Sequence, residues 1–137
     1  MRIALMAVLF LLTACAGQVN EPSSELAGTS WRLVKFQGGD GRVVRPAGSQ
    51  YTLAFNADGS LRARIDCNTG RGSWKSSGPG RIELGPMAIT RAMCPPGSMH
   101  DYVVKQLPDI RSYTIRNGHL FLSLVADGGS YEFEPLK

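Results

Sequence analysis

The stretch Asp66-Cys67-Asn68-Thr69-Gly70-Arg71-Gly72 lies between two strand-like runs, and the rest of this 137-residue chain is organised around it. Asn and Gly tolerate left-handed backbone angles, so we expect the chain to turn sharply within Cys67-Asn68-Thr69-Gly70. The stretch also holds one of the three cysteines, and the others are Cys15 and Cys94. The length around it predicts a single domain with a modest core.

The N-terminus has the pattern of a lipoprotein signal peptide. Met1-Arg2 precedes a ten-residue apolar run, Ile3 to Leu12, which is about half the length of a transmembrane helix. The next residues, Leu12-Thr13-Ala14-Cys15, resemble the lipobox of bacterial lipoproteins. This resemblance implies cleavage before Cys15, lipid on its sulfur and stable anchoring in a membrane. A plain secreted protein with a chance cysteine is the alternative.

The same segment predicts the domain boundaries and the location. We expect residues 1–14 to be the signal peptide, residues 15–25 a lipidated cysteine with a flexible tether, and residues 26–137 the folded domain. Ala16 follows the cysteine, in place of the aspartate associated with retention in the inner membrane. The expected location is therefore the cell envelope, at the periplasmic face of the outer membrane. A formal net charge of +4 favours anionic surfaces such as phospholipid headgroups or lipopolysaccharide, or reflects a solvated basic face.

Apolar residues alternate on both sides of the opening stretch. Tyr51–Phe55 and Ser60–Ile65 are predicted to form a hairpin with Arg62 and Arg64 on its solvent face. Asn117-Gly118 predicts a second hairpin. In the first strand, Val34 and Phe36 break the alternation, which indicates a bulge or a strand covered on both faces. The glycine-rich segment from Gln37 to Gln50 is expected to be a long loop.

One helix is predicted at about residues 98–107. Ser98 is the expected N-cap and Asp101 a weaker capping-box partner. Pro108 should end the helix by moving Leu107 away from helical angles. No alternating strand–helix–strand pattern is present, so the fold class is α+β: a mostly antiparallel, strongly curved sheet or partial barrel of seven to nine short strands, with one packed helix.

Several motifs together resemble the META domain family, also described as HslJ-like. They are Leu26-x-Gly28-Thr29-x-Trp31, Cys67-Asn68 followed by Gly70, Thr90-x-x-Met93-Cys94 and Leu120-x-Leu122, and the resemblance extends from Leu26 to Phe133. It implies an α+β fold with an antiparallel sheet. Members are often envelope lipoproteins linked to heat stress, novobiocin resistance or virulence and motility. The chain departs from the family pattern at Asp66, where glycine is usual, and at Thr69, which replaces a bulky residue.

The cysteines predict a structural bond. With Cys15 lipidated, Cys67 and Cys94 are the two thiols left in an oxidising compartment. A disulfide between them would close about 28 residues and contribute roughly 3–4 kcal/mol in the chain-entropy model. A redox pair is disfavoured because there is no Cys-x-x-Cys. A copper(I) site is a weaker alternative to core methionines, and its ligands would come from Met93, Cys94, Met99, His100 and His119.

The motifs of the common enzyme classes are missing from the sequence. Nucleophilic catalysis would need Cys94 or a serine beside His100 or His119. A disulfide would remove the thiol, and His119 is expected to be solvated in a hairpin turn. There is no nucleophile elbow, P-loop or dinucleotide fingerprint. We expect no catalytic residues, no cofactor, no metal site and no nucleic-acid partner, since a lipid-anchored envelope protein rarely meets nucleic acid.

Two functions fit these patterns. The first is a non-enzymatic, lipid-anchored envelope protein that supports envelope integrity or tolerance of stress and antibiotics through contacts with an envelope protein. The second is a binding module that holds an apolar or lipid-like ligand in the curved sheet. Large residues are expected at the inward positions, which favours a filled core and hence the first function: Trp31, Tyr51, Phe55, Leu122 and Phe133.

Overall fold

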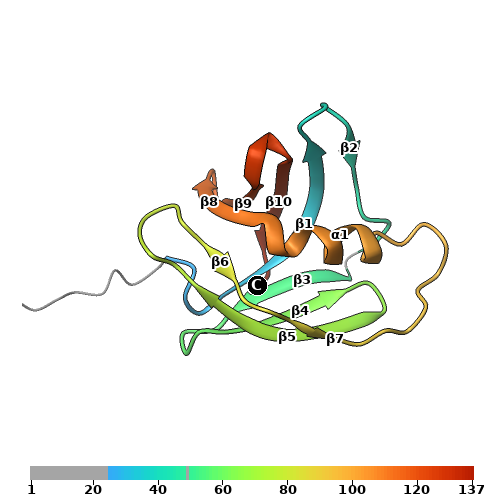
Figure 1. Ribbon diagram of the computed structural model, residues 1–137, viewed down its shortest axis with the longest axis horizontal. Coiled ribbons are helices and arrows are strands. Elements are labelled where there is room, and N and C mark those ends of the chain that lie inside the picture. Colours follow the sequence, from blue (N-terminus) through green and yellow to red (C-terminus); the bar gives the residue numbers. More distant parts are fainter. Residues whose placement is uncertain (1–24, 49) are drawn as a thin grey trace, which may run out of the picture.

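The computed structural model describes residues 25–48 and 50–137. It contains ten strands and one α-helix within these residues (Figure 1). The strands are β1 (Thr29–Gly38), β2 (Val43–Val44), β3 (Tyr51–Phe55), β4 (Ser60–Ile65), β5 (Asn68–Lys75), β6 (Glu83–Leu84), β7 (Ala88–Ile89), β8 (Ile110–Arg116), β9 (His119–Leu124) and β10 (Gly129–Pro135). The helix α1 spans His100–Gln106, and short 3-10 turns cover Leu107–Asp109 and Val125–Asp127. The predicted α+β class is confirmed.

The strands form one curved antiparallel sheet that nearly closes into a barrel. Its order is β6-β5-β4-β3-β1-β10-β9-β8, with β2 added to β1 and β7 added to β5. The two ends of this order meet, because the amide of Ile82 donates to the carbonyl of Arg111 (3.2 Å) and the amide of Tyr113 donates to the carbonyl of Gly80 (3.0 Å). Near-closure of this kind pairs most of the edge groups that an open sheet would leave exposed.

The helix packs against the wall of the barrel. Figure 1 shows α1 crossing between the strands β8–β10 above and β3–β5 below. Val103 is buried, Tyr102 meets the ring of Phe36 edge to face at 5.3 Å between centroids, and the hydroxyl of Tyr131 donates to the side chain of Gln106. Burial in this contact raises the pKa of Tyr131. None of the described helices is both long and apolar enough to cross a membrane.

The predicted ends of the helix need correction. The helix begins at His100, and the hydroxyl of Ser98 accepts the His100 amide (3.1 Å) without capping a later turn. Asp101 does not reach back to Ser98, since its carboxylate contacts the His100 ring. Leu107 keeps helical angles (φ −50°, ψ −42°), because Pro108 occupies the first turn of the following 3-10 helix, where proline needs no amide donor.

The local signals in the strands are mostly confirmed. β3 and β4 form the predicted hairpin, and β8 and β9 pair around Asn117-Gly118, whose φ angles of 53° and 76° match the turn that such a dipeptide favours. The break in β1 is a bulge, since the register with β10 shifts between Leu33 and Lys35. Part of the expected loop is ordered sheet, because β2 pairs with the end of β1.

The turn in the opening stretch lies earlier than predicted. The chain reverses at Asp66-Cys67, and Asn68 to Gly72 already belong to β5. Asp66 has a φ of 55°, in the left-handed region that glycine adopts most easily and that aspartate also tolerates. Asp66, which stands where the family usually has glycine, therefore adopts a backbone conformation that favours glycine.

The inside of the barrel is filled by side chains. Trp31, Tyr51, Phe55, Leu122 and Phe133 are all buried, as predicted. The pocket among the strand residues and α1 offers only about 20 Å³ of space. That space is comparable to one water molecule and far below the size of a small-molecule pocket.

We predict that Phe55→Ala lowers the free energy of unfolding by about 3–5 kcal/mol. The ring is fully buried and packs edge to face on Trp74, with 5.3 Å between centroids. Val125→Ala is the control, because Val125 is 41% exposed and should change stability by no more than about 0.5 kcal/mol. Urea denaturation of both variants checks this, and similar losses in the two would contradict it.

Candidate functional site

The side chain of Asn68 joins the β4–β5 hairpin to a distant segment. Asn68 is fully buried and is the one buried polar residue in the described part of the chain. Its amide nitrogen donates to the carbonyl of Ala92 (2.9 Å), and its amide oxygen accepts from the Ala92 amide (2.7 Å) and the Thr90 hydroxyl (2.9 Å). Every polar atom of the side chain therefore has a partner, as burial requires.

A disulfide reinforces the same junction. Cys67 and Cys94 are bonded, with 5.5 Å between their Cα atoms, which is the pairing that the sequence predicted. The Asn68 amide nitrogen also lies 3.5 Å and 3.4 Å from the two sulfur atoms. The bond leaves neither cysteine with a free thiol, so neither acts as a nucleophile in this state.

We call residues 86–99 the anchored loop. It contains β7 and lies close to β5 because two positions of β5 have no side chain. A Cβ on Gly72 would lie 2.8 Å from Met87 and 2.9 Å from the Pro86 carbonyl oxygen, and one on Gly70 would lie 2.9 Å from Met87. Glycine inside a strand is therefore explained here by close approach of a second backbone.

A groove of about 580 Å³ separates the anchored loop from α1. Its apolar lining comes from Met87, Ile89 and Val104, and its polar lining includes Arg91, Ser98, His100 and Asp101. The Nδ1 atom of His100 lies 2.8 Å from the Asp101 carboxylate. The Nε2 atom is buried and has no hydrogen-bond partner within the described residues.

One wall of the groove is an open strand edge. β7 pairs with β5 alone among the described strands. The Thr90 amide donates to Thr69 (3.0 Å) and Ala92 pairs with Asn68, so alternate residues bind toward β5. The backbone groups of Ile89 and Arg91 consequently point away from β5. They offer donors and acceptors to a further strand.

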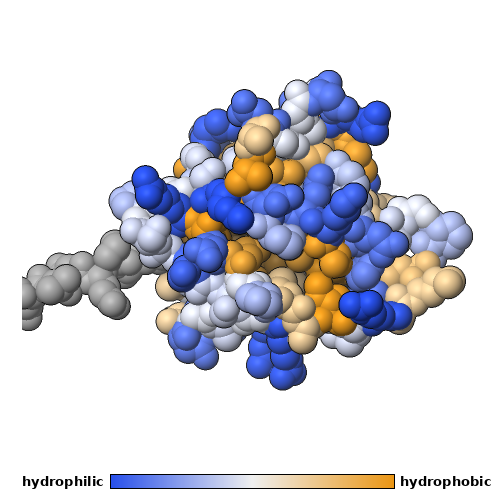
Figure 2. All heavy atoms as spheres, viewed as in Figure 1, coloured by the Kyte–Doolittle hydropathy of each residue, from blue (hydrophilic) through white to orange (hydrophobic). Residues whose placement is uncertain are grey.

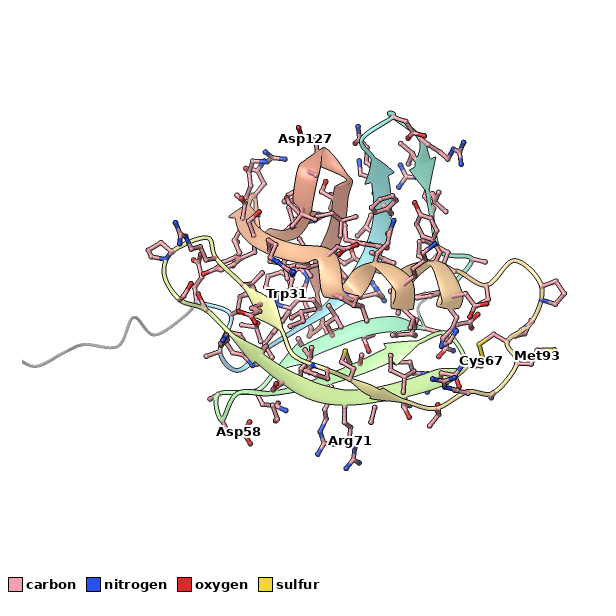
Figure 3. All side chains as sticks on the ribbon, viewed as in Figure 1. Trp31, Asp58, Cys67, Arg71, Met93 and Asp127 are labelled. Carbon is pink, nitrogen blue, oxygen red and sulfur yellow. A yellow bond between two sulfur atoms is a disulfide. The ribbon has the colours of Figure 1, made fainter. Side chains whose placement is uncertain are left out.

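Met93 projects from the anchored loop into solvent. Its exposed fraction is 98%, and Figure 3 shows it at the outer end of this loop, beyond the disulfide at Cys67. The surface in the same view is mostly hydrophilic, with separate hydrophobic patches (Figure 2). Methionine is unbranched and flexible, so Met93 can adapt its side chain to a molecule that contacts this loop.

The structure does not bring together the residues named as ligands of the alternative copper(I) site. Met99 belongs to the core at 5% exposure, whereas Met93 lies in solvent, so these two do not share a ligand set. Within residues 25–48 and 50–137, no three His, Cys, Asp or Glu side chains are grouped to hold a metal ion. Cys15 lies outside the described residues.

The sequence predicted that His119 is a solvated turn residue, but it is the first residue of β9. Its Nδ1 atom lies 2.8 Å from the Glu132 carboxylate, which also pairs with Lys35 at 3.2 Å. Burial raises the pKa of Glu132, but the hydrogen bonds from His119 and Lys35 outweigh it and hold that pKa below its usual value. The pairing of β10 with β9 on one side and with β1 on the other brings these side chains together, and the sequence pattern did not reveal it.

The fold and this junction define a class: a small antiparallel barrel with one packed helix and a disulfide-anchored loop. The META domain family matches residues 24–136, and the chain belongs to that family.

Solved structures agree with this fold. The NMR structure of a protein from Burkholderia xenovorans is 22% identical, with a TM-score of 0.68 over 82% of this chain and 84% of that chain. The crystal structure of a DUF4847 family protein from Bacteroides vulgatus is 18% identical, with a TM-score of 0.59 over 80% of this chain and 94% of that chain. At these identities the likeness concerns the fold alone. No curated protein matches the chain.

We predict that Asn68→Ala lowers the free energy of unfolding by about 2–4 kcal/mol, because Ala92 and Thr90 lose their partners at a buried site. Thr90→Val removes the hydroxyl that donates to Asn68 and accepts from the Thr69 amide (3.0 Å), and it should cost about 1–2 kcal/mol. Urea denaturation with the disulfide intact measures both. A loss below 0.5 kcal/mol for Asn68→Ala, on the order of an ordinary surface substitution, would contradict the role of this side chain.

Proposed function

We propose that this META domain protein is a non-enzymatic, lipid-anchored envelope protein that supports envelope integrity or tolerance of stress and antibiotics through protein contacts. The observation that carries the proposal is the contrast between a filled barrel and an open groove. The pocket among the barrel side chains measures about 20 Å³, whereas the groove beside the anchored loop measures about 580 Å³. Contacts on the outside of the barrel are therefore favoured over a ligand held within it.

The groove has the chemistry of a peptide-binding site. An extended peptide can add to an open strand edge by main-chain hydrogen bonds, with pockets beside the edge receiving its side chains. Here Ile89 and Arg91 supply the edge, and Met87 and Val104 supply apolar surface beside it. A segment of an envelope protein in extended conformation is the partner that this arrangement fits.

The anchor is inferred from the N-terminal sequence. Leu12-Thr13-Ala14-Cys15 resembles a lipobox, and lipid on Cys15 would tether the domain to a membrane through acyl chains. Ala16 after the cysteine supports the periplasmic face of the outer membrane as the location. An oxidising compartment would also account for the disulfide between Cys67 and Cys94.

Mass spectrometry of the protein purified from membranes tests the anchor. We predict a mass that lacks residues 1–14 and includes acyl chains on Cys15, because the lipobox directs cleavage and lipidation at that position. Cys67 and Cys94 should react with an alkylating reagent only after reduction. An unacylated chain would contradict the lipid anchor, and alkylation without reduction would contradict an oxidising location.

Site-specific photocrosslinking in living cells tests the protein contacts. We predict that a photoreactive residue at position 93 forms an adduct of defined mass, whereas the same residue at the exposed position Val125 does not. Arg91→Pro should lower the yield of that adduct at least fivefold, because proline removes an amide donor from the open edge.

Thermal unfolding of the Arg91→Pro variant checks that it still folds, so that loss of the adduct is not mistaken for loss of the fold. Equal adduct yields at positions 93 and 125, or an adduct at 93 that Arg91→Pro leaves unchanged in a folded protein, would count against binding along this edge.

A further inference from the structure

The outer face of the β4–β5 hairpin carries three arginines. Arg62 and Arg64 on β4 and Arg71 on β5 are exposed, while their strand neighbours Leu61, Ala63 and Gly70 are buried. This alternation places the three guanidinium groups on one side of the sheet. We call Arg62, Arg64 and Arg71 the arginine face. Figure 3 shows Arg71 pointing from β5 into solvent, away from α1.

The positive charges of this face form no ion pairs in the described part of the chain, although hydrogen bonds from Ser60 and, after them, the charge of Arg62 lower the pKa of Asp58. Arg62 and Arg71 lie directly opposite each other in the β4–β5 register, an arrangement that disfavours the folded state when both residues carry the same charge. None of the three makes an ion pair with a carboxylate in the described part of the chain. Arg64 donates only to the backbone carbonyl of Asp66, at 3.2 Å.

The surrounding strand positions are also free of acidic side chains. Thr52 and Ala54 on β3, and Thr69 and Ser73 on β5, alternate toward the same face. Asp58 in the turn before β4 already accepts hydrogen bonds from the amide and hydroxyl of Ser60, at 2.8 Å and 2.6 Å. The face is thus open to an external anion.

The N-terminal segment enters the domain beside this hairpin. The amide of Gly28 donates to the carbonyl of Phe55, the last residue of β3, at 2.7 Å. The 24 residues that precede the described chain, with Cys15 among them, therefore join the domain next to the strands that carry the arginines. A membrane that held this segment would lie within reach of the arginine face.

We propose that the arginine face binds the phosphate groups of anionic phospholipids at the membrane surface. A guanidinium presents parallel N–H donors that match phosphate oxygens. Each cation near an anionic membrane surface strengthens binding by about fivefold. This inference goes beyond the proposed protein contacts, and it depends on the proposed anchor only for bringing the domain near a membrane.

Vesicle flotation tests the proposal with the full-length chain. The readout is the ratio of partition coefficients between vesicles of phosphatidylglycerol with phosphatidylcholine and vesicles of phosphatidylcholine alone. The segment before residue 25 is the same in every variant, with or without residues 1–14, so its own membrane affinity does not alter the comparison. We expect R62Q/R64Q/R71Q to lower this ratio at least tenfold, and we expect the wild-type ratio to fall with added salt because the charges are exposed.

The control variant R45Q/R81Q/K105Q removes the same charge from exposed positions outside β4 and β5. It should keep the ratio within about twofold of the wild-type value, because the proposal attributes binding to the arginine face and not to net charge. Circular dichroism confirms that both variants fold. R62K/R64K/R71K should give a ratio between those of R62Q/R64Q/R71Q and the wild type, because it keeps the charge but loses the parallel guanidinium donors.

Three results would overturn the proposal. They are equal binding of the wild type to both vesicle types, equal losses in the two glutamine variants, and tighter binding to duplex DNA than to the anionic vesicles at the same salt. Loss of the photocrosslink at position 93 would leave this result unaffected, so the two proposals fail separately.

Discussion

The hydrogen bonds between the side chain of Asn68 and the backbone of Ala92 are the interaction on which the rest of the structure depends. They bring residues 24 positions apart into the same buried junction, and the Cys67–Cys94 disulfide prevents that junction from separating. An asparagine can do this because its amide carries both donors and an acceptor in one plane. Because the polar atoms of Asn68 all have partners and Gly70 and Gly72 lack side chains, the anchored loop lies directly on β5. The helix α1 begins at the residue that follows this loop.

In this structure, the residues that stabilise the fold differ from those that can contact another molecule. Aromatic and aliphatic side chains fill the barrel and leave a cavity of about 20 Å³, so the interior contributes burial and rigidity but little room for a ligand. The outside carries what can still bind: an open strand edge and a methionine that is 98% exposed. A rigid frame holds these groups in fixed positions, which lowers the entropic cost of binding.

The groove and the arginine face are made by opposite sides of the same strand. The inward positions of β5, including Asn68 and Gly70, hold the anchored loop, while its outward position Arg71 joins Arg62 across the register. A strand alternates its side chains between two faces, so one short segment serves both surfaces. A domain built this way can contact a membrane with one face while a different surface remains available to a protein.

The sequence alone determined the features that arise from short-range chemistry. Alternation with a period of two predicted the β3–β4 hairpin, and Asn117-Gly118 predicted the β8–β9 turn, because backbone preference decides both locally. Counting cysteines in an oxidising compartment predicted the disulfide. The tertiary structure decided what depends on distant partners: the turn at Asp66, the helical angles of Leu107, the hydrogen bond between His119 and Glu132, and the groove. Such features depend on register and packing between segments far apart in the chain, and local preferences do not encode them.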